Sequence, residues 1–187
     1  LGLAGIMESF RQGKVCIVNA PGTGIADDKA IYAYVPKMIQ YYLNQEPILK
    51  NIQTYQMDHP DQKEYVVNNI EKMVIKKTDG SGGYGMLMGN SVSEKEIDDY
   101  LQQLNKNPKN YIAQPILNLS TAPCILDNEL VPRCVDLRPF AISGANKIEV
   151  CPGGLTRVAM RKGSLVVNSS QGGGSKDTWI INKSEDA

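Results

Sequence analysis

The strongest periodic pattern in the sequence is that of an amphipathic helix. Between Lys29 and Leu43, apolar side chains recur at intervals of three and four residues, which gathers them on one helix face. Asp27 or Asp28 precedes the pattern and is expected to cap the helix. Pro36 is expected to bend the helix or to divide it, because proline removes a backbone donor and clashes with the preceding turn. The segment therefore predicts a helix that packs through one face.

Two other segments carry helical patterns. Residues 93–106 combine a narrow apolar stripe with Ser93 and Glu96, which fit a capping box at the start of a helix. This helix is expected at the surface of the protein. Residues 65–72 predict a shorter helix in front of an apolar run.

Apolar and β-branched runs predict strands in the rest of the chain. Residues 111–117 are more apolar than alternating, so this strand is expected in the interior, with Pro115 interrupting its hydrogen bonds. In the C-terminal half, alternation places Asp136 and Arg138 on one face of a strand. The other expected strands cover residues 13–19, 73–75, 86–88, 133–142, 147–150 and 164–168, with a hairpin turn at 143–146 and with a turn followed by another strand within 151–159. Strands and helices together predict an α+β fold.

Composition narrows the class of protein. The 20 lysine and arginine residues balance 20 aspartate and glutamate residues. Zero net charge and few aromatic residues disfavour a nucleic-acid binder, and no run of about eighteen apolar residues is present to span a membrane. Four scattered cysteines and one histidine, His59, argue against zinc chemistry. We expect a cytosolic protein with reduced cysteines that handles small molecules.

The length and the first residue bear on domain organisation. A chain of 187 residues can bury a core as one domain or as two small lobes. It opens on Leu1 rather than on methionine, and the opening stretch is loop-like. We therefore expect a piece of a longer protein.

The candidate chemistry centres on a glycine-rich loop between two apolar runs. Residues 73–76 read Met-Val-Ile-Lys, and four glycines follow between positions 80 and 85. Glycine lets backbone N–H groups approach an anion closely and lysine supplies a positive charge, so the pattern suits a triphosphate. A hairpin turn with a surface lysine explains the pattern equally well. The loop fits neither a Walker A motif nor a dinucleotide-binding fingerprint.

Six sequence blocks occur in an order that resembles one family. They read Asn-Ala-Pro-Gly-Thr-Gly-Ile-Ala-Asp-Asp-Lys at 19–29, Val-Ile-Lys at 74–76 with Gly-Ser-Gly-Gly-Tyr-Gly at 80–85, Tyr-Ile-Ala-Gln-Pro at 111–115, Val-Asp-Leu-Arg-Pro-Phe at 135–140, Gly-Gly-Leu-Thr-Arg at 153–157 and Val-Asn-Ser-Ser-Gln-Gly-Gly-Gly-Ser-Lys-Asp-Thr-Trp at 167–179. The chain resembles the ATP-grasp superfamily, and more closely its circularly permuted type 2 branch, which includes glutathionylspermidine synthase. The resemblance implies an ATP-grasp-like fold, circularly permuted, with antiparallel sheets and flanking helices.

The resemblance also implies residue roles. Lys29 and Lys76 would hold the nucleotide phosphates, a mobile glycine loop would close over them, and the backbone of residues 112–115 would meet the adenine. Lys77 stands where the family usually has proline. Strand alternation lets only one of the neighbouring lysines face the phosphates, and the register of the match selects Lys76. The predicted nucleotide-binding residues are Lys29, Lys76, Gly80, Ser81, Gly82, Gly83, Tyr84, Gly85, Gln114, Pro115 and Asn168.

Arg138 and Arg157 are the candidate catalytic residues, because guanidinium groups grip phosphate or carboxylate through paired hydrogen bonds. A structural ion pair between Arg138 and Asp136 is an equally good interpretation. Residues 168–176 are expected to form an anion-facing loop or lid, and a flexible end segment is the alternative. In this family the magnesium carboxylates precede the first lysine block, and Asp27 and Asp28 are read here as helix caps, so the metal ligands are not identified.

The activity implied is ATP-dependent joining of a carboxylate to an amine or thiol through an acyl phosphate, with ATP and Mg²⁺ as cofactors. A longer parent protein would be the carbon–nitrogen bond-forming ligase, and this chain its nucleotide-binding part. Its partners would be small-molecule or peptide carboxylates and amines, not nucleic acid or membrane. The alternative is a catalytically silent nucleotide-binding or scaffolding module. Two lobes are expected, one of about residues 1–60 with 100–187 and one of residues 61–99 around the glycine loop.

Overall fold

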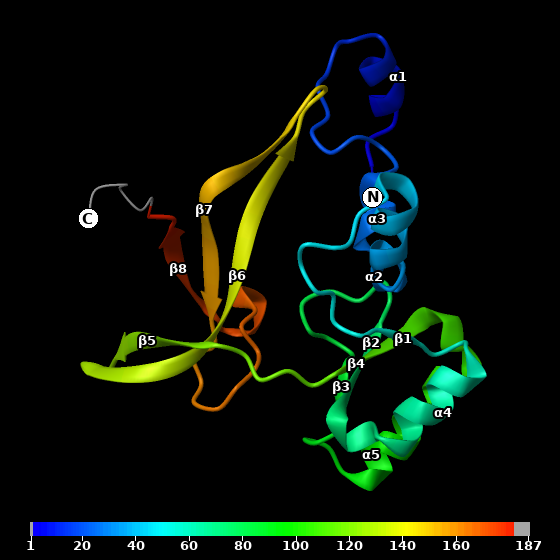
Figure 1. The fold of residues 1–187 in the computed structure, drawn as a ribbon, viewed down its shortest axis with the longest axis vertical. Helices are drawn as coiled ribbons and strands as arrows, with labels where there is room; N and C mark the ends of the chain where they lie inside the picture. The colour runs from blue at the N-terminus through cyan, green and yellow to red at the C-terminus, as the bar shows by residue number, and fades with distance from the viewer. Residues whose placement is uncertain (1, 182–187) are drawn as a thin grey trace. The chain divides into compact units, whose positions relative to one another are not determined.

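The computed structural model describes residues 2–181, which form two compact units (Figure 1). Of the described residues, the first unit comprises residues 2–80 and 85–116, and the second comprises residues 81–84 and 117–181. Each unit contains one four-stranded sheet whose neighbouring strands are antiparallel. The predicted α+β fold with antiparallel sheets and flanking helices is confirmed. The predicted lobe boundaries stay a prediction.

The first unit combines helices with a sheet in the strand order β1-β4-β2-β3. Its helices are α1 (Ile6–Arg11), α2 (Lys29–Tyr32), α3 (Val35–Leu43), α4 (Pro60–Asn68) and α5 (Glu94–Lys106), and its strands are β1 (Tyr55–Gln56), β2 (Met73–Lys77), β3 (Leu87–Met88) and β4 (Tyr111–Pro115). Throughout residues 2–181, every helix is too short or too polar to cross a membrane.

The core of the first unit lies between one face of its sheet and the helices α4 and α5 (Figure 1). Met73 and Ile75 of β2 share this face and pack with Val66 of α4 and Leu104 of α5, and none of the four is more than 3% exposed. A shift of one residue in strand register would turn these side chains to the other face, so the apolar set fixes the register. Alternation therefore places Lys76 on the face opposite the core.

Sequence signals at the helix ends are confirmed. The Ser93 N–H donates to the Glu96 carboxylate at 2.9 Å, and the Ser93 hydroxyl accepts from the Glu96 N–H at 3.4 Å. The bond from the Ser93 N–H, together with a second bond that the Ser93 hydroxyl donates to the same carboxylate at 2.7 Å, lowers the pKa of the Glu96 carboxyl. Asp28, rather than the aspartate before it, caps α2 by accepting from the Ala30 N–H at 2.8 Å. Pro36 stands in the first turn of α3, so the predicted helix is divided in two.

The second unit contains a sheet in the strand order β5-β6-β7-β8. Its strands are β5 (Thr121–Leu126), β6 (Glu129–Ser143), β7 (Ile148–Val158) and β8 (Gly174–Trp179). The predicted hairpin turn is confirmed, because Ser143 pairs with Ile148 and the Gly144 N–H donates to the Lys147 carbonyl at 2.8 Å. Figure 1 shows β6 and β7 side by side as one long two-stranded ribbon. This ribbon carries the arginine candidates of the second unit.

Two predicted strands are wrong. Residues 13–19 and 164–168 belong to neither sheet. Val18 is 83% exposed and Asn19 has a left-handed φ of 65°, so the first segment turns instead of extending beside a neighbour. A β-branched run becomes a strand only where another strand satisfies its backbone hydrogen bonds, and pairing of this kind is not visible in a local pattern.

Element boundaries also differ from the sequence expectations. The helix expected at residues 65–72 instead begins at Pro60 and ends at Asn68. Its earlier start is explained by Pro60, because proline fits the first turn of a helix. Residues 148–158 form one strand rather than two strands separated by a turn. The expected loop at 168–176 is only partly a loop, since residues 169–171 form a 3₁₀ turn and β8 begins at Gly174.

Candidate functional site

The face of the first sheet opposite its core carries one of the predicted phosphate-binding lysines. Val74 lies opposite Gln114 and Lys76 lies opposite Ile112, so Lys76 and Gln114 are diagonal neighbours on this face. The amine of Lys76 donates to Oε1 of Gln114 at 2.8 Å. Lys77 belongs to the other face of β2 by alternation and is exposed at its end. Of the two neighbouring lysines, Lys76 is thus the one beside Gln114.

Lys29 is the second predicted lysine, at the start of α2. Its backbone N–H donates to the Thr78 carbonyl at 3.1 Å, and its side-chain amine donates to the carbonyls of Thr78 and Gly80. Burial lowers the pKa of Lys76, and the positive charge of Lys29 lowers that pKa further. The two ammonium groups therefore lie close enough to repel each other. An anion bound between them would relieve this repulsion.

Gln114 belongs to a short chain of side-chain hydrogen bonds. Its Nε2 donates to the Thr54 hydroxyl at 2.9 Å, and that hydroxyl donates to the Ile52 carbonyl at 3.0 Å. Gln114 is 7% exposed and Thr54 is 8% exposed, so the chain is buried. The next residue, Pro115, ends β4 opposite Met73. Sequence reasoning missed Thr54, because its place beside a residue 60 positions away depends on the pairing of β1 with β4.

The glycine-rich loop connects β2 to β3. Gly82, Gly83 and Gly85 have φ angles of 68°, 78° and 67°, a left-handed conformation that glycine adopts without a steric penalty. In the first unit, the Tyr100 hydroxyl donates to the Gly85 carbonyl at 2.8 Å. Burial raises the pKa of Tyr100, which keeps this hydroxyl protonated as a donor. In the second unit, the Gln171 amide donates to the Gly82 carbonyl.

Close packing within the second unit explains why a glycine occupies position 82. A Cβ at this position would lie 3.1 Å from the Tyr84 ring and 3.2 Å from Nδ2 of Asn168. The Tyr84 ring itself is 66% exposed, and its backbone N–H donates to the Ser81 carbonyl at 3.3 Å. The tip of the glycine loop therefore packs beside Asn168 within the second unit.

Arg138 and Arg157 both bind the carboxylate of Asp136. Arg157 donates from Nε and Nη2 to the two carboxylate oxygens at 3.0 and 2.7 Å, and Arg138 donates from the same two atoms to Oδ2 at 3.3 and 2.9 Å. Nη1 of Arg157 donates to Oδ1 of Asn168 at 3.1 Å. The Arg138 side chain is 49% exposed and that of Arg157 is 19% exposed. The ion pair between Arg138 and Asp136, one of the two sequence interpretations of Arg138, is present. Arg138 is the more exposed of the two arginines.

The side-chain oxygens of Asp136 and Asn168, which the two arginines bind, are not arranged to bind magnesium. Both oxygens of Asp136 accept hydrogen bonds from guanidinium groups, and the side-chain oxygen of Asn168 accepts from Arg157. Magnesium binds through such oxygens, and two positive groups already occupy them. Elsewhere in residues 2–181, no group of three or more His, Cys, Asp or Glu residues is arranged to hold a metal ion.

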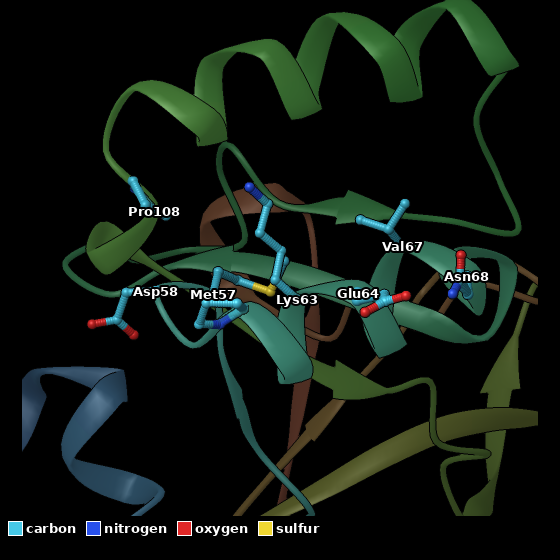
Figure 2. Close-up of a pocket in the computed structure, with 8 residues that line it drawn as sticks. Met57, Asp58, Lys63, Glu64, Val67, Asn68 and Pro108 are labelled. Atoms are coloured by element: carbon cyan, nitrogen blue, oxygen red, sulfur yellow. The ribbon is translucent and has the colours of Figure 1, made fainter.

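A hollow of about 510 Å³ lies in another part of the first unit (Figure 2). It is lined by Met57, Asp58, Pro60, Lys63, Glu64, Val67, Asn68 and Pro108. Most of these residues come from α4 and the segment before it, so the hollow lies on the helix-covered side of the sheet. The hollow includes none of the predicted site residues. The candidate chemistry therefore lies on the other face of the sheet and in the second unit, not in this hollow.

The sequence matches the circularly permuted ATP-grasp type 2 family over residues 1–159, and the chain belongs to this family. The predicted family is therefore confirmed. An uncharacterized protein of Synechocystis sp. is 55% identical over 181 residues, a match that covers 97% of this chain and 38% of that protein. An uncharacterized protein of Mycobacterium tuberculosis is 48% identical over 181 residues, covering 97% of this chain and 33% of that protein.

A relative from Frankia alni carries a name that states an activity. It is named "Putative glutamate--cysteine ligase 2-3" and is 45% identical over 175 residues, covering 94% of this chain and 20% of that protein. The chain thus spans between 20% and 38% of the length of the three relatives described here.

Proposed function

We propose that this chain is the nucleotide-binding part of an ATP-dependent ligase that joins a carboxylate to an amine or thiol. The observation that carries the proposal is the placement of two lysines at one end of β2: Lys29 donates to the carbonyls of Thr78 and Gly80, and Lys76 is held part-buried on the sheet face by Gln114. Two cations held together in a half-buried place favour an anion of high charge density, and a triphosphate is such an anion. Membership of the ATP-grasp family supports the choice of ATP.

The proposed reaction transfers the γ-phosphoryl group of ATP to the substrate carboxylate. The amine or thiol then attacks the carbonyl carbon of the acyl phosphate, and phosphate leaves. This chemistry requires alignment of the reactants and neutralisation of developing negative charge. In this proposal Lys29 and Lys76 neutralise the charge of the phosphates.

We assign different tasks to the two arginines. Arg138 is half-exposed, and its Nη1 donates no hydrogen bond within residues 2–181. Arg138 is therefore better placed than Arg157 to contact a phosphoryl group or a carboxylate. Arg157 is more buried and is bonded to Asp136 and Asn168, so it holds these two side chains in place. In the sequence interpretation both arginines were candidates for gripping the substrate, and an ion pair with Asp136 was an equal alternative for Arg138.

The relative from Frankia alni guides the choice of substrates to test. Its name describes the joining of two amino acids, an example of carboxylate–amine ligation. The match covers only a fifth of that protein, so amino acids are the first substrates to test rather than a conclusion. Magnesium is expected with ATP from the family, but Asp136 and Asn168 are not suited to bind it as they are arranged here.

The test of nucleotide binding is calorimetric titration with a non-hydrolysable ATP analogue. Replacing Lys29 or Lys76 with alanine should weaken binding by about 1.5 to 3 kcal/mol, the scale of a hydrogen bond to a charged group. Lys77→Ala is the matched control, because it removes a neighbouring charge from the other face of the same strand. Equal losses in all three variants, or none in the first two, would contradict the site.

The test of ligase activity is phosphate release by a longer protein that contains this chain, run in parallel with the chain alone, with ATP, magnesium, and sets of amino acids, short peptides and polyamines. Substrate-dependent release supports a ligase. Nucleotide binding without release under any substrate set would favour the silent-module alternative.

A further inference from the structure

The hydrogen bonds that surround Lys76 run in one direction. A lysine ammonium can only donate, so the oxygen of the Gln114 amide must face it, as observed at 2.8 Å. The nitrogen of that amide then faces the Thr54 hydroxyl as a donor, at 2.9 Å. The hydroxyl can accept this bond and still donate to the Ile52 carbonyl, at 3.0 Å. The charge on Lys76 therefore sets the orientation of every group in the chain.

We propose that Gln114 and Thr54 are positioning residues, which hold the ammonium group of Lys76 at one place on the sheet face so that it meets the nucleotide phosphates. The inference rests on the proposed function, since it takes Lys76 as a phosphate-binding residue. Both partners are nearly buried and lie on strands of the first sheet or next to one, so they offer a rigid support.

An amide suits this task better than a carboxylate. A glutamate at position 114 would form an ion pair with Lys76 and neutralise the charge that the phosphates require. The amide oxygen of Gln114 accepts a hydrogen bond but carries no net charge, so Lys76 is held and still positive. Lysine has a flexible four-carbon stem, and fixing it before the ligand arrives reduces the entropy lost on binding.

The hydrogen bonds of the Gln114 amide also distinguish the positioning of Lys76 from a direct contact with adenine. Its oxygen accepts from Lys76 and its nitrogen donates to Thr54, so both ends of the amide are bonded within the protein. A contact between this side chain and the base would have to break one of these bonds. Positioning of Lys76 should affect any polyphosphate, whereas a contact with the base should affect only ligands that carry adenine.

The experiment therefore compares two probes, inorganic tripolyphosphate and a non-hydrolysable ATP analogue, by calorimetry on the full chain. Gln114→Leu removes the acceptor and should weaken binding of both probes by about tenfold, the effect of losing one hydrogen bond to a charged group. Thr54→Val removes the hydroxyl at nearly constant volume and should weaken both by about threefold, because Gln114 loses its support. Unfolding curves of each variant show whether the fold is kept.

Gln56→Leu is the matched control. Gln56 is also a nearly buried glutamine of the same sheet, but its partners are Tyr34 and His59 rather than Lys76. This variant should lose stability like Gln114→Leu and should bind both probes as the wild type does. Weakening of tripolyphosphate binding to the same extent in the control would overturn a specific role for Gln114.

A direct readout on the lysine completes the test. The pKa of Lys76, followed by NMR of its side-chain carbon and nitrogen, should fall in Gln114→Leu, since a hydrogen bond to the charged form is lost. The control should leave it unchanged. An effect of Gln114→Leu on the ATP analogue alone, or on neither probe, would overturn the positioning role. If Lys76→Ala itself binds both probes normally, the proposed function fails instead, so the two failures are distinguishable.

Discussion

The two units each hold a pair of cationic side chains, and the pairs differ in how their charge is balanced. Lys29 and Lys76 in the first unit have carbonyl and amide oxygens as partners, and their charges repel. The two arginines of the second unit, Arg138 and Arg157, share the carboxylate of Asp136. Within residues 2–181 the lysine pair has no carboxylate partner, whereas the arginine pair shares one carboxylate, which offsets one of its two positive charges.

This difference separates binding from structural support. A half-buried cation without a counter-ion lowers stability unless something else favours it, so the lysine pair indicates a place for an anionic ligand. A guanidinium bonded to a carboxylate needs no ligand to explain its position, which fits the structural role of Arg157, whereas the half-exposed Arg138 keeps its proposed contact with the substrate. Sequence motifs offered the lysines as nucleotide-binding residues and the arginines as catalytic candidates, with an ion pair as the alternative for Arg138, and their surroundings distinguish the two pairs.

The largest effect is expected from removing both charges of the lysine pair. Lys29→Met with Lys76→Met should reduce affinity for an ATP analogue by more than about 100-fold, because each charge contributes about 1.5 to 3 kcal/mol. Its unfolding free energy should change by less than about 1 kcal/mol, since the lost bond to Gln114 is offset by removal of the repulsion. Calorimetry and urea unfolding measure the two quantities. A double variant that unfolds readily but binds normally would reverse the comparison.

A smaller effect is expected from replacing the two arginines one at a time. Arg157→Ala removes a mostly buried guanidinium that donates to Asp136 and Asn168 and should lower the unfolding free energy by about 1 to 3 kcal/mol. Arg138→Ala should lower it by less than about 1 kcal/mol, because its ion pair is half-exposed. Urea unfolding of the two variants is the measurement, and equal losses would show that the two arginines support the fold alike.

The smallest effect concerns pH. Because the pKa of Lys76 is lowered, it loses its proton at a lower pH than an ordinary lysine, and affinity for an ATP analogue should decline as pH rises through that pKa. Lys76→Arg keeps its charge in this range and should lack the decline. The sign for stability is opposite: the unfolded chain binds more protons, so the contribution of Lys76 to unfolding free energy rises with pH between its folded and unfolded pKa values. Titrations at several alkaline pH values test the affinity.

Local signals predicted much of the fold, and non-local pairing explains what they missed. The capping box at Ser93, the division at Pro36 and the hairpin turn at 143–146 depend on a few neighbouring residues, and each is present. Residues 13–19 have the composition of a strand, but no strand of either sheet lies beside them. The same limit applies to the site, where Thr54 is recognisable only once β1 and β4 are paired.

The contacts of Lys29 imply an exchange of partners on ligand binding. Its amine donates to the carbonyl oxygens of Thr78 and Gly80, which begin the glycine-rich loop. If nucleotide phosphates bind this amine as proposed, they compete with those two oxygens for the same protons. Each carbonyl released must find water or another donor. The affinity of the site therefore reports the difference between two sets of hydrogen bonds, and weakening the contact of the loop with Lys29 would strengthen binding of the nucleotide.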